Sequence, residues 1–335
     1  MNQYALLSLF FLLPLHLSAQ QSADFGAPKF APSDSLKLLI IGQDLAAVGG
    51  LPTYQHGYLN HLPGPPPAGV TTYTSLPKLN GLRHFDSWGA GHVLARLYAQ
   101  DTTFANCVIV IGLYLVGELE AIAAGKHNQA IRSFAAWVKE QQRPIMIRIG
   151  YEFEGEWNSY EPEAYKAAWR QIVHTFDAEQ VRNAAYVWQS AGMNVDNIAD
   201  WYPGDEYVNW VAFSQFDGGN KMGQRMIRFA EAHDKPVMIA EATPKVDLTS
   251  GEGEAHWANW YQPLFDRLYA NDRLKALAYI NTDWDSQPMW KGQGWGDSRV
   301  QVNALVKERW IAEMAKSIWL KGEASLFSQL GYENK

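Results

Sequence analysis

Short apolar runs alternate with amphipathic stretches along most of the chain. Near-continuous apolar runs of this length predict strands that are buried on both faces, as in parallel sheets. Such runs occupy residues 36–45, 107–115, 144–153, 184–191, 209–216, 236–243 and 274–284, and residues 70–76 could supply another strand. The amphipathic stretches between them predict helices at residues 128–142, 162–177, 223–234, 255–270 and 300–319.

This alternation predicts an α/β fold with parallel strands and right-handed crossovers. About eight such units over about 300 residues favour a (β/α)8 TIM barrel in a single domain, which we expect over residues 36–335. A doubly wound open sheet is the alternative. No Gly-x-Gly-x-x-Gly fingerprint follows the first predicted strand, which argues against it.

The N-terminus is expected to carry a targeting signal. An apolar run at residues 5–17 is followed by Ser18 and Ala19, which predicts a signal peptide over residues 1–19. Residues 20–35 are polar and irregular, and we expect them to form a linker. Since the apolar run is too short for a confident membrane span, we expect a secreted, periplasmic or extracellular protein without a membrane anchor.

Composition narrows the choice of partners. The net charge of -7 argues against nucleic acid, anionic membranes and strongly acidic polysaccharides. The 14 Trp and 16 Tyr could stack on sugars or simply fill a large core. The single cysteine, Cys107, lies in an apolar run and is expected to be inert. The sequence has no HExxH motif and no tight His/Cys cluster, so we expect neither a metal nor a cofactor. We also expect the protein to be a monomer.

Acidic residues follow two of the predicted strands. The run at 144–153 contains Glu152 near its end and is followed by Glu154 and Glu156. The run at 236–243 contains Glu241. Catalytic residues of such barrels lie at the carboxyl ends of the strands. Two carboxyls in one cleft, one protonated and one ionised, are the minimal equipment for glycoside hydrolysis. Glu152 and Glu241 are the first candidates for this pair. Alternatively, Glu154 or Glu156 could be the acid in place of Glu152, and Glu241 could be a structural ion-pair partner.

Residues 151–157, with the sequence YEFEGEW, resemble the His-Glu-x-x-Gly-x-Trp signature of glycoside hydrolase family 26, a family of the clan A barrels. The resemblance implies that Glu152 is the acid/base. The run at 236–243 is similar to the seventh strand of that family, which implies that Glu241 is the nucleophile. Residues 202–213 are similar to the approach to its sixth strand, and the resemblance extends from about residue 36 to about residue 319.

Two departures from the family pattern bear on mannan specificity more than on the chemistry. Tyr151 replaces the His of mannanase-like members, and Phe216 stands where many clan members have a Tyr that holds the nucleophile. Segments such as GQDLAAVGG and RIGYEFEGEWNSYEP look most like the endo-1,3-β-xylanase branch. The resemblance therefore implies a retaining endo-β-glycanase acting on a neutral plant or algal polysaccharide. We expect β-1,3-xylan first, with β-mannan and mixed-linkage β-glucan as alternatives.

Further residues at the strand ends are candidates for substrate contact. They are Arg148, Trp157, Trp188, Gln189, Asn281 and Trp284. Arg148 precedes Glu152 by four residues on the same predicted strand face, so it could fix a carboxylate or merely support the barrel. Each Trp could stack on a sugar or pack in the core. The long loop at 283–299, rich in Trp, Gly and Asp, lies where substrate should bind.

Two other functional classes stay open on the sequence alone. A carbohydrate-binding barrel without turnover would bind polysaccharide and release no product, although the presence of both carboxylates argues against it. A polysaccharide lyase would leave unsaturated ends, and the acidic charge balance speaks against that class. A serine hydrolase is disfavoured because no Gly-x-Ser-x-Gly elbow occurs.

Overall fold

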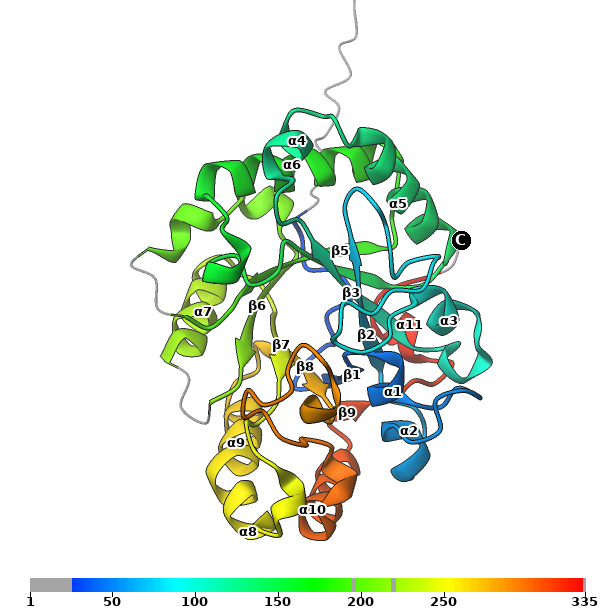
Figure 1. The fold of residues 1–335 in the computed structure, drawn as a ribbon. Coiled ribbons are helices and arrows are strands. Elements are labelled where there is room, and N and C mark those ends of the chain that lie inside the picture. The colour runs from blue at the N-terminus through cyan, green and yellow to red at the C-terminus, as the bar shows by residue number, and fades with distance from the viewer. Residues whose placement is uncertain (1–25, 194–196, 218–220, 334–335) are drawn as a thin grey trace, which may run out of the picture.

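A closed barrel of parallel strands forms the centre of the protein (Figure 1). The computed structural model describes residues 26–193, 197–217 and 221–333. The barrel strands are β1 (Lys37–Gly42), β2 (Gly69–Ser75), β3 (Val108–Tyr114), β4 (Ile145–Ile149), β5 (Ala184–Ser190), β6 (Trp210–Gln215), β7 (Val237–Ala242) and β8 (Leu274–Ile280). Neighbouring strands pair in sequence order, and pairing of β1 with β2 closes the ring. This confirms the predicted (β/α)8 barrel and excludes the open sheet.

Helices surround the barrel on its outside (Figure 1). They are α1 (Leu45–Val48), α2 (Tyr58–His61), α3 (Ala95–Gln100), α4 (Leu119–Ala123), α5 (Asn128–Glu140), α6 (Pro162–Ala178), α7 (Lys221–Ala232), α8 (Gly253–His256), α9 (Gln262–Ala270), α10 (Ala304–Met314) and α11 (Leu326–Gln329). Each predicted helix has a counterpart, while α1 to α4 were too short for the pattern to reveal. In the described part of the chain, no helix combines the length and apolarity needed to cross a membrane.

Side chains alternate between the barrel interior and the layer beneath the helices. On β4, Ile145 and Ile147 pack outward in the larger apolar cluster, whereas Met146 packs inside with Ala185 and Val187 of β5. Nearer the carboxyl ends of the strands, the inward positions become polar. The inward-facing polar residues are Tyr73, Arg148, Gln189, Ser214 and Glu241. The same alternation therefore places apolar side chains inside the barrel near the amino ends of the strands and polar side chains inside it near their carboxyl ends.

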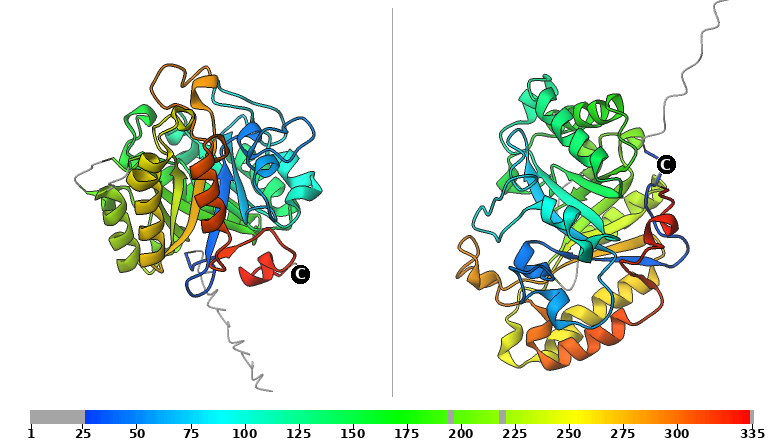
Figure 2. Two further views of the ribbon diagram at one scale, coloured as in Figure 1. Left: turned by 90° about the horizontal axis from the view of Figure 1, so that it is seen from below. Right: turned by 90° about the vertical axis from the view of Figure 1, so that its right-hand side faces the viewer.

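The segment before β1 closes the end of the barrel at which the strands begin. Phe30 is buried in the interior cluster with Leu326 and Leu330 at the C-terminus. The indole of Trp210 donates to the carbonyl of Lys29 at 2.7 Å. Figure 2 shows α11 at the end of the barrel opposite the loop that follows β8. The predicted linker is thus wrong for residues 26–35, which are part of the domain; residues 20–25 and the predicted signal peptide at 1–19 lie outside the described residues.

Strand β7 contains one residue more than its neighbour β6 can pair. Phe213 pairs with Ile239, but the next residue, Ser214, pairs with Glu241, so that Ala240 is passed over. Because side chains alternate with a period of two, this shift reverses the face on which the following residue lies. Ala240 packs inside the barrel, and Glu241 also reaches its inner face, where it contacts Arg148.

Candidate active site

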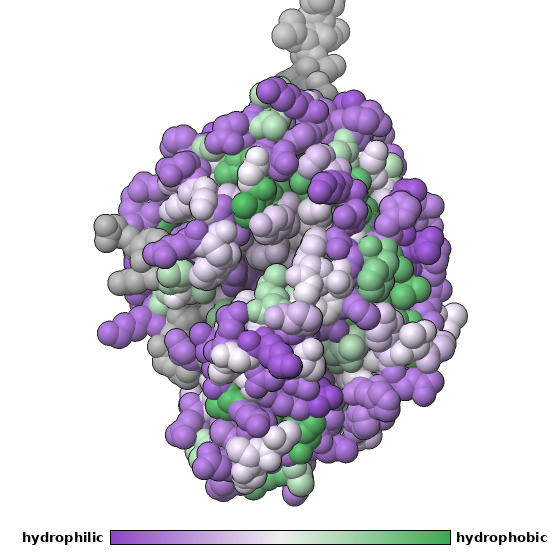
Figure 3. All heavy atoms as spheres, in the orientation of Figure 1, coloured by the Kyte–Doolittle hydropathy of each residue, from purple (hydrophilic) through white to green (hydrophobic). Residues whose placement is uncertain are grey.

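A cleft of about 1150 Å³ lies at the carboxyl ends of the strands, with Glu152 and Glu241 in its wall. Aromatic side chains line much of the rest. They are Tyr73, Trp88, Tyr114, Tyr151, Trp157, Phe216, Trp284, Trp290 and Trp295. Figure 3 shows that this face of the molecule is hollowed near its middle and has a largely hydrophilic rim. Flat rings around two carboxyls suit a sugar chain, whose faces carry C–H groups and whose edges carry hydroxyls.

Glu241 is held by a buried cation and a phenol. Its Oε1 accepts a hydrogen bond from Nη1 of Arg148 and lies 3.0 Å from the hydroxyl of Tyr73. Arg148 is fully buried, and a carboxylate beside such a guanidinium is stabilised in its ionised form. Gly112 on β3 makes room for Tyr73 and Arg148, because a Cβ there would lie 2.5 Å from the ring of Tyr73 and 2.9 Å from Nη2 of Arg148. Glu241 is thereby presented as an anion with one oxygen occupied.

Glu152 lies just beyond the end of β4, in a backbone turned away from the strand. Its φ is +56°, and the side chain of Asn158 donates to its carbonyl at 2.8 Å. The hydroxyl of Ser214 lies 2.7 Å from its Oε1. Burial, and next the charge of Glu241, raise the pKa of Glu152 to about 8. The site therefore favours the protonated form of Glu152 and places a guanidinium against Glu241, which is the division of labour that glycoside hydrolysis needs.

The two other acids that follow β4 lie in different surroundings. Glu154 accepts hydrogen bonds from the hydroxyl of Ser190 and from the backbone N–H groups of Ala191, at 2.9 Å, and Met193, at 3.2 Å. Its carboxyl thus fixes the loop after β5 and is no part of the described cleft wall. Glu156 is exposed on a short 3₁₀ turn. Among the three acids, only Glu152 lines the cleft.

Several residues expected to contact substrate do not reach the cleft. Trp188 is fully buried beneath the helices and stacks on Phe153, with ring centroids 4.7 Å apart. The side chain of Asn281 is also buried; it accepts from the N–H of Val300 at 2.9 Å and so fixes the chain after β8. Both predictions are wrong, because these side chains are directed away from the cavity. Arg148 and Gln189 lie below the cleft floor, where they hold other polar groups rather than sugar.

Trp157 and Trp284 do line the cleft, as predicted. Trp157 is 57% exposed, so most of its ring is free to stack on a ligand. Trp284 is buried and contacts Trp290 and Trp295 in the long loop after β8, with centroids 5.3 and 4.9 Å apart. Lys245, which also lines the cleft, places its ammonium 4.4 Å from the centre of the Trp295 ring.

Some residues of the site were missed by the sequence reasoning. Tyr73 was seen only as part of the uncertain strand at 70–76, and Ser214 only as part of the run at 209–216. Their positions on the inner strand face would have placed them near the carboxyls once the barrel was assumed. Trp88 and Tyr114 lie in the cleft wall with ring centroids 6.3 Å apart. No local pattern distinguished these two from core aromatics.

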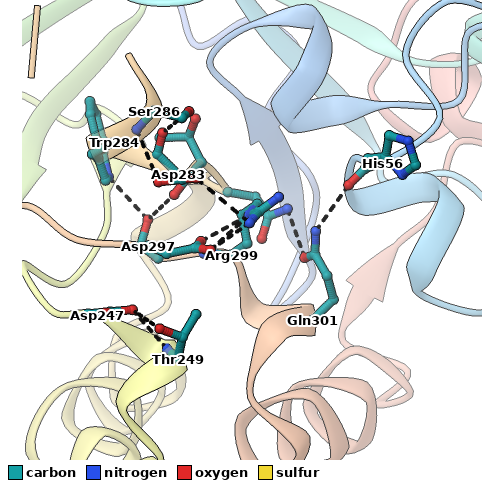
Figure 4. A network of polar contacts seen from close by, with 12 residues as sticks. His56, Asp247, Thr249, Asp283, Trp284, Ser286, Asp297, Arg299 and Gln301 are labelled. Atoms are coloured by element: carbon teal, nitrogen blue, oxygen red, sulfur yellow. Dashed lines mark hydrogen bonds and ion pairs between the residues drawn. The ribbon is translucent and has the colours of Figure 1, made fainter. Parts of the chain in front are cut away.

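A polar clamp closes the neck of the long loop after β8. The guanidinium of Arg299 binds both carboxylate oxygens of Asp297, at 2.6–3.2 Å, and lies 3.9 Å from Asp283 (Figure 4). Asp283 and Asp297 form an antiparallel bridge, and the indole of Trp284 donates to the hydroxyl of Ser298 at 3.1 Å. The clamp thus fixes the base of the loop that carries the three clustered tryptophans.

Metal chemistry has no visible support in the described ranges, which contain no group of three or more His, Cys, Asp or Glu side chains placed to hold an ion. Cys107 is buried below the site, and burial raises the pKa of its thiol to about 12.

Comparison with known proteins agrees with this geometry. The model of glycosyl hydrolase family 26 matches residues 112–279. The chain is 31% identical to beta-1,3-xylanase TXYA of a Vibrio species and 30% identical to a beta-1,3-xylanase of an Alcaligenes species; each match covers 91% of this chain and 70% or 68% of the relative. The fold is similar to a β-mannanase of Bacteroides ovatus (TM-score 0.61, 13% identity, 88% of this chain and 93% of that one). It is also similar to an endo-β-1,4-mannanase double mutant of Cellulomonas fimi (TM-score 0.62, 17% identity, 87% and 74%).

Proposed function

Because this chain belongs to glycosyl hydrolase family 26, we propose that it is a secreted, retaining endo-β-glycanase that hydrolyses β-1,3-xylan. The observation that carries the chemistry is the buried pair formed by Glu152 and Glu241, one held neutral and the other held as an anion. The choice of polymer is supported by the two relatives named beta-1,3-xylanase. The mannanase neighbours are less than 25% identical and support the fold alone.

In the first step, Glu152 gives its proton to the glycosidic oxygen while Glu241 attacks the anomeric carbon. Arg148 and Tyr73 both lie at Oε1 of Glu241, and no described residue donates to Oε2. We therefore assign Oε2 as the attacking oxygen. The bond to the leaving sugar breaks as the ester bond to Glu241 forms, and the leaving sugar departs with the proton from Glu152.

In the second step, Glu152 is ionised and accepts a proton from water, whose oxygen attacks the anomeric carbon of the glycosyl-enzyme. Glu241 departs as a carboxylate, which Arg148 stabilises again. Two displacements at one carbon retain its configuration. Proton NMR of the first product formed tests this directly: the β-anomer is expected, and initial formation of the α-anomer would show inversion.

The aromatic walls support cleavage within a polymer. Trp88 comes from the loop after β2 and Tyr114 from the carboxyl end of β3, whereas Trp290 and Trp295 come from the loop after β8. Rings supplied by separate loops can bind sugars on both sides of the scissile bond. Secretion rests on the apolar run at residues 5–17, and mass spectrometry of the exported protein should find Gln20 at its N-terminus.

The decisive experiment offers β-1,3-xylan, β-1,4-xylan, β-mannan and mixed-linkage β-glucan to the chain beginning at Gln20. Reducing ends are followed for wild type, Glu152→Gln and Glu241→Ala. We expect release from β-1,3-xylan, reduced roughly a thousandfold or more in both variants. Glu154→Gln is the matched control, because that carboxyl follows the same strand and lies outside the cleft wall; its activity should persist.

Other outcomes would reassign the protein. Release from β-mannan alone would keep the mechanism and replace the substrate. Products that absorb in the near ultraviolet would indicate a lyase. Binding of a polymer without release of ends, or release that survives both substitutions, would overturn the proposal and favour a carbohydrate-binding barrel.

A further inference from the structure

A chain of buried hydrogen bonds joins the two carboxyls beneath the cleft floor. Arg148 contacts Glu241, and the same Nη1 lies 2.9 Å from Oε1 of Gln189. The amide nitrogen of Gln189 lies 3.0 Å from the hydroxyl of Ser214, which lies 2.7 Å from Oε1 of Glu152. Gln189 and Ser214 are buried, so bulk water does not compete for these bonds.

The direction of this chain follows from the chemistry of its first member. A guanidinium can only donate hydrogen bonds, so the group of Gln189 that faces Arg148 must be its carbonyl oxygen. The amide nitrogen of Gln189 then faces Ser214 and must donate to it. The hydroxyl of Ser214 accepts this bond with a lone pair and donates its own hydrogen to the carboxyl oxygen of Glu152.

We propose that Gln189 and Ser214 are positioning residues that fix the catalytic proton of Glu152 on Oε2, by directing the hydrogen of Ser214 to Oε1. This proposal rests on the assignment of Glu152 as acid/base. An oxygen that accepts from Ser214 is disfavoured as the site of the proton, which leaves the other oxygen to carry it. No described residue hydrogen-bonds to that second oxygen, and Glu152 lines the cleft where the glycosidic oxygen would lie.

The same arrangement serves both steps of the reaction. After Glu152 has given up its proton, the hydrogen bond from Ser214 stabilises the carboxylate, and the proton from water returns to the same oxygen. Donation by Ser214 lowers the pKa of Glu152, against burial and the charge of Glu241, which raise it. The other charges that act on Glu152 are Arg148, which lowers its pKa, and Glu154, which raises it.

Two substitutions remove the chain at different points. Ser214→Ala deletes the donor to Glu152, and Gln189→Met keeps a side chain of similar length that cannot orient the hydroxyl. On the polymer, we expect kcat/KM of each variant to fall about tenfold, as for one lost hydrogen bond to a charged group. In Ser214→Ala, the alkaline limb of the pH profile should move up by about one pH unit, because the ionised form of Glu152 has lost a donor.

A leaving group that needs no proton separates this role from a structural one. With the dinitrophenyl glycoside of the disaccharide unit of the cleaved polymer, kcat/KM of both variants should stay within about twofold of wild type. Ser190→Ala is the control, since it removes a similar Ser–Glu bond, to Glu154, and should leave the pH profile unchanged. Melting temperatures verify that each variant is folded.

The outcomes distinguish this proposal from the proposed function. If wild type releases no ends, or Glu152→Gln retains full activity on the polymer, the proposed function fails. If Glu152→Gln is inactive on the polymer while Ser214→Ala and Gln189→Met keep the pH profile and kcat/KM of wild type, only the positioning role of Gln189 and Ser214 is overturned. Equal losses on the polymer and on the dinitrophenyl substrate would also overturn it, because they would indicate a general distortion of the site.

Discussion

The guanidinium of Arg148 contacts the carboxylate of Glu241 on β7, although Arg148 lies only four residues before Glu152 on its own segment. The reason is that β4 ends at Ile149 and the backbone then turns, with φ of +51° at Gly150 and +56° at Glu152. The two carboxyls of the site are thereby treated unequally. One receives a full positive charge, and the other receives a neutral hydroxyl.

Arg148→Met should abolish most of the activity. A buried Glu241 without its cation is disfavoured as an anion, so we expect kcat/KM to fall by roughly a hundredfold or more. Arg143→Met is a matched control, because Arg143 is also buried but donates to the carbonyl of Phe104, away from the cleft. In Arg143→Met we expect a loss of stability with kcat/KM close to wild type, and an unchanged kcat/KM in Arg148→Met would contradict the role assigned to Arg148.

Glu152 should make the fold less stable as the pH rises. Its pKa is raised from 4.5 to about 8 in the folded protein, so folding favours the protonated form. Stability is greatest below the unfolded value and is lost between about pH 4.5 and pH 8. Glu152→Gln should therefore melt several degrees above wild type at pH 8, with the difference vanishing near pH 4.5. The exposed Glu156→Gln is the control, and a pH-independent difference in Glu152→Gln would refute the effect.

Two tryptophans that looked equivalent in the sequence should respond in opposite ways to truncation. Trp157→Ala should raise KM about tenfold and leave the melting temperature nearly unchanged, because its ring is mostly exposed in the cleft. Trp188→Ala should destabilise the fold by about 3–5 kcal/mol, because it opens a cavity among packed rings. Calorimetry and steady-state kinetics on the same samples separate the two effects, and a stable Trp188→Ala with raised KM would show that Trp188 contacts substrate after all.

Arg299→Met should loosen the loop after β8. Without the guanidinium, Asp283 and Asp297 repel each other at the neck of the loop, so Trp290 and Trp295 lose their fixed position. We expect a KM increase of roughly fivefold to tenfold with a smaller change in kcat. Arg309→Met serves as the control, since that exposed side chain pairs with Glu254 on the outer helices. A fall in kcat at constant KM would show that the clamp acts on the chemistry rather than on the loop.

The sequence allowed the barrel, the strand positions and the segments that carry both carboxyls to be predicted, because apolar periodicity is a local signal. The resemblance to family 26 at residues 151–157 was confirmed by the comparisons. The direction of individual side chains was harder to predict. Alternation placed Glu154 on the same face as Glu152, but the positive φ at Glu152 breaks the alternation.

Long-range packing was the other source of error. Residues 26–35 looked like a linker because only Phe30 is strongly apolar, yet its partners at Leu326 and Leu330 lie about 300 residues away in the chain. Trp188 lies within β5 and Trp157 lies after the end of β4, and only the completed barrel shows that the first faces the helices and the second faces the cleft. Such contacts have no counterpart in local sequence.

Because Ala240 has no partner on β6, the orientation of Glu241 depends on the pairing register of β7 and not only on which residues β7 contains. If every residue of β7 paired in turn with β6, Ala240 would pair with Ser214 and Glu241 with Gln215. The carboxyl of Glu241 would then face the apolar layer beneath the helices. Any redesign that regularises this pairing without removing a residue, however small its effect on the fold, would therefore turn the carboxyl of Glu241 away from the barrel interior.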